Sequence, residues 1–433
     1  MSFGTKNHLL SRRRVLSQLL VAGSAWAAPA GWAQSGMAAP RDGRLIMVFL
    51  RGAYDGLSAL VPYADPRYRQ LRPNIAIAAP DGSAQSSIAL DDTFALHPAL
   101  SPLFPLWQQG VLSVLPAAGS PEPTRSHFDA QHQWELGSPR KGGGTQGWMN
   151  QWANQITQSG TRGAGTEKPN ALAVGESNPF ILAGPAPVQR VPRGQAATQK
   201  GALGNDRTRE AMLHLYQGDD ELSQAFRAGA QSRAQTAQIL SENEMASMVG
   251  DRQEMMAANN GAPSAKGLLL DAQYLGTLMR RDRSLRIGFL SAGGWDTHAN
   301  QGAAQGQLAN NLTSLASALV QLRKDFSQPN DVVMVCSEFG RTSAENGTRG
   351  TDHGHGNALW LMGNKVQGGR WHGQWTGLDQ GNLHEGRDLP VHHDFRAVFA
   401  QVMQRTQGLS GADLDALFPG LVWDRALDKL MKS

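Results

Sequence analysis

The chain has 433 residues, of which 40% are hydrophobic and 18% are charged, so it suits a folded globular protein and is not mainly disordered. Its formal net charge is +4, but four of the 40 basic residues lie in an N-terminal segment without acidic residues, which leaves 36 basic against 36 acidic side chains in the rest. This even balance gives no support to nucleic-acid binding.

The first residues have the layout of an export signal. A twin arginine in SRRRVL (Ser11–Leu16) precedes a short apolar run from Leu19 to Ala30, and Ala25-Trp26-Ala27 has the pattern of a cleavage site. We expect residues 1–27 to be a twin-arginine signal peptide, removed on export to the periplasm or beyond, and residues 28–43 to be a linker. An ordinary secretory signal and an uncleaved anchor are the alternatives. The apolar run is short and interrupted for a membrane span, so we expect no stable span after cleavage.

The single cysteine, Cys336, excludes intrachain disulfide bonds even though the expected destination is oxidising. It lies inside an apolar run of strand length, which favours a buried and inert thiol.

Downstream of the linker, apolar runs of strand length alternate with segments of helical spacing. The expected strands are Arg44–Leu50, Val111–Leu115, Ala171–Val174, Leu285–Leu290, Val332–Cys336 and Leu359–Met362. The expected helices include Leu100–Gln109, Trp148–Gln158, Leu268–Arg280 and a crossover helix from Leu308 to Phe326.

This alternation predicts one α/β domain over residues 44–433, with a mostly parallel central sheet flanked by helices. A polar, helix-favouring stretch at about 205–265 has only a thin apolar stripe, and we interpret it as a helical insertion in that domain.

Two of the predicted strands end in polar or glycine-rich loops that carry an unusual density of carboxylates and imidazoles. The residues concerned are Asp296, His298, Glu338, Asp352, His353 and His355. Open α/β sheets build ligand sites at the carboxyl ends of their strands. Mixed carboxylate and imidazole ligands suit Zn, Mn or Fe better than Ca or Mg, so we expect one or two divalent ions here. A hydrogen-bonded structural cluster is the alternative.

Two earlier segments add candidates. Asp55 follows the first strand in a glycine-flanked turn, where it is either a ligand or a helix cap. Ser126 stands beside Arg125 at the predicted start of a helix, which is a good position for a nucleophile that attacks an anionic substrate. The alternative for Ser126 is a helix cap.

Five motifs also resemble a known family. LRGAYDGL, TRSHFDAQ, GGWDTH, SEFGRT and GTDHGHG, in this order behind a twin-arginine signal, resemble the exported bacterial family called domain of unknown function 1501. That family looks like a distant branch of the alkaline phosphatase/sulfatase superfamily. The resemblance implies an alkaline-phosphatase-like, mostly parallel sheet, a binuclear metal centre, and hydrolysis or transfer at phosphate or sulfate esters.

The resemblance also implies roles for individual residues. Asp55 would be the metal ligand after the first strand, Ser126 the nucleophile, and Asp296 and His298 the ligands of one metal. Glu338 stands where an Asp-His pair is expected for the other metal, but Phe339 follows it, so one histidine is missing unless Asp352-His353 replaces the pair. His353 or His355 would supply the late histidine. Arg125 and Arg341 would bind the anionic group bidentately.

The expected function is that of an exported metal-dependent hydrolase acting on a phosphate or sulfate ester, either a small molecule or part of a polymer. The alternative is a non-catalytic exported binding or assembly factor on a hydrolase-like scaffold. The sequence identifies no protein partner.

Overall fold

The structure is a computed structural model. It describes residues 42–138, 144–158, 168–176, 179–198, 201–241, 259, 262 and 264–432. The expected signal peptide and most of the expected linker lie outside the described residues. Within the described ranges, every helix is too short or too polar to cross a bilayer.

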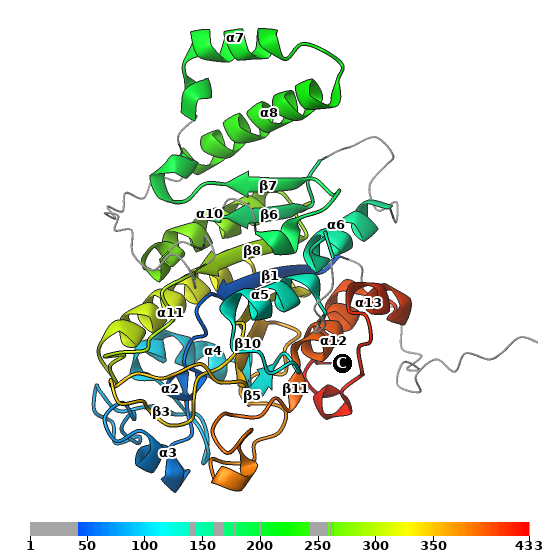
Figure 1. The fold of residues 1–433 in the computed structure, drawn as a ribbon. Helices are drawn as coiled ribbons and strands as arrows, with labels where there is room; N and C mark the ends of the chain where they lie inside the picture. The colour runs from blue at the N-terminus through cyan, green and yellow to red at the C-terminus, as the bar shows by residue number, and fades with distance from the viewer. Residues whose placement is uncertain are drawn as a thin grey trace, which may run out of the picture. The chain divides into compact units, whose positions relative to one another are not determined.

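An eight-stranded sheet forms the centre of the fold (Figure 1). Its strands, in the order in which they pair, are β11 (His393–Asp394), β5 (Leu112–Gly119), β10 (Asn357–Gly363), β9 (Asp331–Cys336), β1 (Arg44–Leu50), β8 (Ile287–Ala292), β6 (Ala171–Val174) and β7 (Val188–Val191). β10 pairs antiparallel with both of its neighbours, and the other pairings are parallel. The prediction of a mostly parallel sheet is therefore confirmed.

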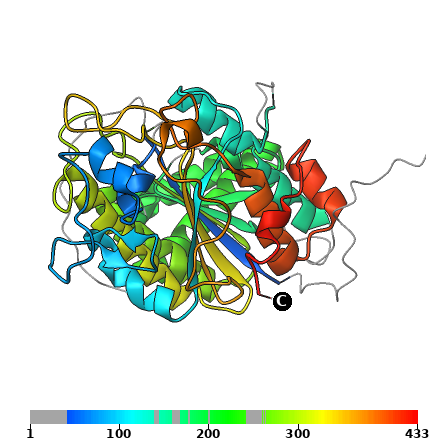
Figure 2. The same cartoon turned by 90° about the horizontal axis from the view of Figure 1, so that it is seen from below.

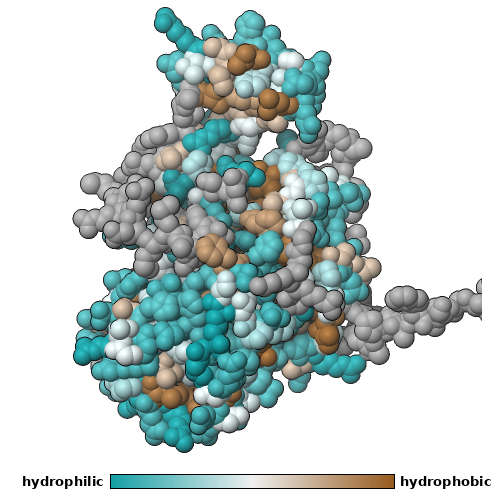
Figure 3. Space-filling view, in the orientation of Figure 1, coloured by the Kyte–Doolittle hydropathy of each residue, from teal (hydrophilic) through white to brown (hydrophobic). Residues whose placement is uncertain are grey.

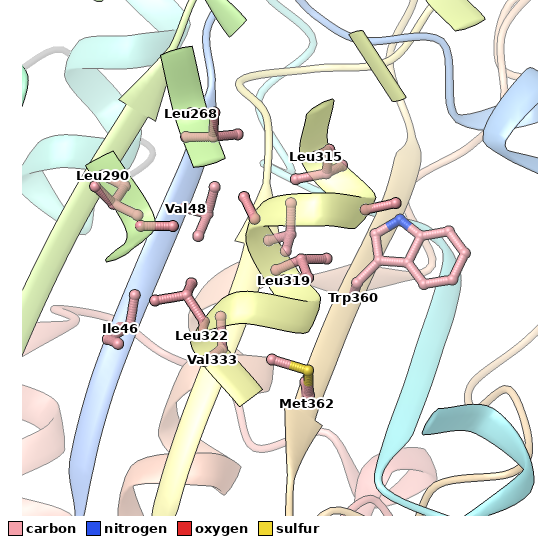
Figure 4. Packing of buried hydrophobic residues seen from close by; sticks show 14 of the residues in the cluster. Ile46, Val48, Leu268, Leu290, Leu315, Leu319, Leu322, Val333, Trp360 and Met362 are labelled. Carbon is pink, nitrogen blue, oxygen red and sulfur yellow. The ribbon is translucent and has the colours of Figure 1, made fainter. Parts of the chain in front are cut away.

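The central strand β1 is apolar along its whole length because both of its faces are covered. Alternate residues point to opposite faces. Ile46 and Val48 lie in a core cluster with Leu315 and Leu319 of the crossover helix, as Figure 4 shows. On the other face, the ring of Phe49 contacts Trp134 with 5.8 Å between ring centroids.

Helices cover both faces of the sheet (Figure 2). One face carries α4 (Phe104–Gln108), α10 (Leu268–Arg281) and α11 (Gln307–Asp325), and the other carries α5 (His127–Leu136), α6 (Trp148–Gln158), α12 (Phe395–Gln407) and α13 (Gly411–Leu417). The crossover helix predicted from Leu308 to Phe326 is α11. Trp134 stacks on Phe395 with 3.9 Å between centroids, which ties α5 to α12.

The structure differs from the sequence predictions in two details. The helix expected over Leu100–Gln109 is divided into a 3₁₀ helix (Pro98–Leu103) and α4. Pro102 and Pro105 lack the amide hydrogens that a continuous α-helix would need there. The edge strand β7 is not among the expected strands.

The remaining elements lie outside the main sheet. A small antiparallel sheet contains β2 (Leu60–Val61), β4 (Ala95–Leu96) and β3 (Ile88–Ala89), and two short helices, α2 (Gly56–Ala59) and α3 (Pro66–Leu71), lie near it in the chain.

The predicted helical insertion contains α7 (Asp206–Leu215) and α8 (Glu221–Ser241), while much of its second half lies outside the described residues. Apolar atoms are visible on this segment in Figure 3, and Leu215 and Leu222 are both mostly exposed.

Candidate metal centre

The carboxyl ends of β1, β8 and β9 meet at one edge of the sheet, and the loops that leave them are packed tightly together. A Cβ atom on Gly52, after β1, would lie 2.8 Å from the backbone nitrogen of Asp296, after β8. A Cβ atom on Gly354 would lie 2.4 Å from the carbonyl carbon of Arg341, after β9. Glycine is therefore required at both positions, because a side chain would force these loops apart.

Three side chains converge in this region. Potential ligand atoms of His127, Asp296 and His353 all lie within 4.8 Å of one another. The Nε2 atoms of His127 and His353 are 3.0 Å apart, and Asp296 Oδ1 lies 3.3 Å from the latter. His298 extends the group, because its Nε2 lies 2.9 Å from Asp296 Oδ1 and 3.0 Å from His353 Nε2. We call these four residues the cluster.

Each cluster histidine has an acceptor at its other ring nitrogen. His127 Nδ1 lies 2.7 Å from Glu338 Oε1, and His298 Nδ1 lies 3.1 Å from Asp352 Oδ1. His353 Nδ1 lies 2.9 Å from the carbonyl oxygen of Arg125. A neutral imidazole that donates through Nδ1 presents a bare lone pair at Nε2. With each ring in this form, all three Nε2 lone pairs would be directed into the cluster.

This arrangement attracts positive charge. Burial opposes protonation of His127, but hydrogen bonds to Asp296 and Glu338 outweigh it and raise the pKa of His127 to about 9. Burial alone would raise the pKa of Asp296, yet its bonds to His127 and His353 and the charge of Arg341 hold that pKa well below its usual range. Imidazole nitrogens 3.0 Å apart repel each other unless a proton or a metal ion lies between them. Three imidazoles and one carboxylate fit a Zn, Mn or Fe ion.

Glu338 lies one layer behind the cluster, with its side chain fully buried. Its Oε1 accepts hydrogen bonds from the backbone nitrogen of Gly52 (2.7 Å) and from Gln131 Nε2 (2.9 Å) as well as from His127. Its Oε2 accepts a bond from Ser337 Oγ at 2.9 Å. Histidines that bind metals commonly donate their second nitrogen to such a carboxylate, which fixes the ring and its tautomer. The position of Glu338 is that of an orienting group behind His127.

Arg341 is buried and bonded to the protein. Its guanidinium donates to Asp296 Oδ1 at 2.6 Å and to backbone carbonyl oxygens of Gly52 (2.5 Å), Ala53 (2.5 Å), Trp295 (3.2 Å) and Thr351 (3.1 Å). These bonds join the loops after β1 and β8 to the later loop that carries His353. Arg341 thus lies against a cluster carboxylate, and its donors face protein groups where the sequence analysis expected them to face an anionic substrate.

Asp55 lies in a different network from the cluster. Its Oδ2 accepts hydrogen bonds from Arg72 (2.6 Å), Gln301 (2.7 Å) and Ser58 (2.8 Å), and both members of the Asp55–Arg72 ion pair are buried. Burial would raise the pKa of Asp55, but the Arg72 guanidinium lowers it below its ordinary value. Asp55 is therefore not among the side chains that converge with His127 and His353, and a fixed cation already neutralises it.

The remaining expected residues, Ser126, Arg125 and His355, lie outside the cluster and have other contacts. Ser126 is exposed and caps α5, accepting a bond from the backbone nitrogen of Asp129 at 3.4 Å. The guanidinium of Arg125 pairs with Glu385 (2.5 Å) and Asp388 (2.8 Å). His355 packs against His384, with 4.6 Å between ring centroids, and is not a member of the cluster.

His127 is the cluster residue that the sequence analysis did not select. A signal was present, since His127 follows Ser126 in the TRSHFD motif and opens the helix after a parallel strand. Helices in open α/β sheets begin at the edge where ligands bind.

Comparisons with known proteins complete the description. A family model described as "Protein of unknown function (DUF1501)" matches residues 42–418. A search of curated proteins gave no match.

Several solved structures share a low similarity with the chain. The lipoteichoic acid synthase LtaP from Listeria monocytogenes is 10% identical, with 92% of this chain and 79% of that chain covered and a TM-score of 0.38. The alkaline phosphatase from the Antarctic bacterium TAB5 is 10% identical, with 86% and 100% covered and a TM-score of 0.34. The C-terminal periplasmic domain of EcEptC from Escherichia coli, in complex with Zn, is 10% identical, with 74% and 72% covered and a TM-score of 0.31.

Proposed function

The chain belongs to the DUF1501 family of proteins of unknown function, and from this premise we propose that it is a metal-dependent hydrolase of phosphate or sulfate esters. The observation that carries the proposal is the convergence of three Nε2 atoms and the Asp296 carboxylate. His127, His353 and Asp296 would hold a Zn, Mn or Fe ion, together with His298, whose side chain is 44% exposed.

The ion, when bound, supplies positive charge that polarises an ester oxygen and stabilises the negative charge that develops on it. The protein's own groups supply the rest. Ser126 would be the nucleophile, because its hydroxyl is exposed beside His127 at the start of α5. The free amide groups of the first turn of a helix favour an anionic group at that place.

Two further parts of the proposal rest on the sequence. Export by the twin-arginine route, to the periplasm or beyond, is supported by the motif in residues 11–16 and the apolar run that follows it. An anionic ester, free or carried on a polymer, is the substrate class that suits a cation beside a helix N-terminus.

The test begins with the mature chain, residues 28–433. Metal content is measured after purification, and the protein is then stripped with a chelator and reloaded separately with Zn²⁺, Mn²⁺ and Fe²⁺. Each form is assayed on a panel of aryl phosphate monoesters, phosphate diesters and aryl sulfates. We expect turnover of at least one ester class in a metal-loaded form, abolished in His353→Ala. Absence of turnover in every loaded form contradicts the proposal.

One observation favours a second candidate, a non-catalytic binding or assembly factor. Structural zinc sites are closed by four protein ligands, whereas catalytic sites keep a position open. If His298 binds together with the other three residues, four ligands would fill a tetrahedral ion. This candidate predicts a tightly held metal, no turnover on the panel, and recovery of a specific partner when the loaded protein is used as bait.

A further inference from the structure

We propose that the centre holds one metal ion, and that the buried guanidinium of Arg341 takes the place that a second cation would occupy. This inference rests on the proposed function, because it assumes that the cluster binds a metal. It concerns the number of ions per chain, which can be measured without an activity assay. It differs from the binuclear centre that the family resemblance implied.

Asp296 is the carboxylate at the middle of the cluster. Its Oδ1 is the oxygen nearest to His298 and His353, at 2.9 Å and 3.3 Å. Arg341 donates to that same oxygen at 2.6 Å, and its own side chain is fully buried. A carboxylate that bridges two ions needs a free oxygen for each of them. Here one oxygen already carries a permanent cation, because arginine does not lose its proton in proteins.

The other carboxylates that could bind another ion are already bonded. Asp55 Oδ2 accepts three hydrogen bonds, one of them from the buried Arg72, with which it forms an ion pair. Glu338 accepts bonds from four donors, shared between its two oxygens. Glu338 would have to give up such a bond to coordinate an ion. The Oδ1 atom of Asp55 has no hydrogen-bond partner among the described residues, but the Asp55 carboxylate is already paired with the buried Arg72, and a buried charge that loses its partner is strongly destabilising.

The charge balance around the cluster also limits the number of ions. Arg341 offsets Asp296, and Arg72 offsets Asp55. Two carboxylates remain, Glu338 and Asp352, and each accepts from the Nδ1 atom of a cluster histidine.

The nearby cation Arg51 does not offset Glu338 or Asp352. Glu135 and Glu176 already share it, at 2.6 Å and 3.0 Å. One divalent ion therefore balances the charges of Glu338 and Asp352. A second ion would add two positive charges that none of the carboxylates named here is left to balance.

The experiment is a metal titration of the mature chain after chelator treatment, with Zn²⁺ and with Mn²⁺, read out by native mass spectrometry and by elemental analysis of the protein after gel filtration. We expect saturation at one ion per chain with either metal. Two ions per chain, both lost together in Asp296→Asn, would overturn the inference.

Two matched variants sharpen the result. Asp55→Asn keeps the shape of the side chain and its distance from the cluster, and we expect it to retain one ion per chain. Asp296→Asn is expected to retain less than a tenth of the wild-type content. Loss of metal in folded Asp55→Asn, equal to that in Asp296→Asn, would also overturn the inference. Circular dichroism checks folding, and if Asp55→Asn does not fold, the wild-type stoichiometry decides alone.

The two proposals fail in different ways. Two ions with ester turnover refute the single-ion inference and leave the hydrolase intact. One ion without turnover leaves the inference intact and refutes the hydrolase.

Discussion

His127 Nδ1 lies 2.7 Å from Glu338 Oε1, and this hydrogen bond joins the first residue of α5 to the loop after β9 across 211 positions of sequence. It also determines which nitrogen of His127 faces the cluster. The ring's Nε2 lone pair is available to a metal only while a carboxylate holds the proton at Nδ1.

Replacing Glu338 tests this orienting role. Glu338→Gln keeps the size of the side chain but removes the charge, and its amide can donate where the carboxylate only accepts. We expect metal affinity to fall about 10- to 100-fold, as is typical when an orienting partner is lost. Competition with a chromophoric chelator measures the dissociation constant. Glu122→Gln, at an exposed position, is the control. An unchanged affinity would contradict the role assigned to Glu338.

Metal binding should stabilise the folded chain. A ligand at about 1,000 times its dissociation constant adds about 4 kcal/mol to the free energy of unfolding. Zn²⁺ should therefore raise the midpoint of thermal unfolding in the wild type but not in His127→Ala or His353→Ala. His214→Ala, on an exposed position of α7, should shift like the wild type. Equal shifts in all four proteins would show that Zn²⁺ binds elsewhere.

Arg341 should contribute strongly to stability. Arg341→Met removes donors from Asp296 and from four backbone carbonyl oxygens while filling a similar volume. Removing one partner of a buried ion pair costs about 3–5 kcal/mol. Urea denaturation of the metal-free proteins measures the difference. A loss below about 1 kcal/mol, the scale of an exposed ion pair, would contradict this reading of the contacts.

Two substitutions separate the capping role of Ser126 from a nucleophilic one. Ser126→Ala should reduce stability by about 1 kcal/mol, because it removes the cap of α5, whereas Ser126→Asn retains a good cap. If Ser126 is the nucleophile, both variants lose turnover by about a thousandfold or more. Restored turnover in Ser126→Asn would mean that the residue is a cap alone.

The carboxyl group of Asp271, in the first turn of α10 and outside the metal centre, should make the free energy of unfolding depend on pH. Burial raises its pKa to about 6, and Arg193, at 3.2 Å, offsets this only in part. Because the folded-state pKa exceeds the ordinary value of 3.8, the folded chain holds a proton that the unfolded chain releases between about pH 4 and 6. The contribution of Asp271 to the free energy of unfolding is thus fully present below pH 4 and is lost as the pH rises through 6.

Asp271→Asn removes that titration. The variant should be more stable than the wild type at pH 7.5, by on the order of 2 kcal/mol, and the advantage should shrink toward zero at pH 4.5. Urea unfolding of the metal-free proteins at both pH values measures the difference in free energy of unfolding between variant and wild type. The effects of other titrating groups cancel in this difference. An advantage of the same size at both pH values would contradict the raised pKa of Asp271.

The positions of the strands could be predicted because their signal is local. Arg44–Leu50 and Val332–Cys336 are continuous apolar runs, and a strand buried on both faces requires such a run. The crossover helix between β8 and β9 was located by its own local signal, the helical spacing of its leucines, and parallel strands of one sheet need such a long connection. The division of the predicted helix could also have been predicted, because Pro102 lies inside it, but the helix was expected to be continuous.

The chain's sequence by itself determined the central sheet, its mostly parallel strand direction, and the edge at which polar residues gather. Only the tertiary structure decided which of those ligands meet, because His127, Asp296 and His353 come from three distant segments and the direction of each ring depends on its hydrogen-bond partner. The partner of His353 is the backbone carbonyl of Arg125, which no residue pattern reveals. Likewise, Asp55 and Asp296 both follow apolar strands, and only packing shows that Arg72 neutralises the first while the second lies among three imidazoles.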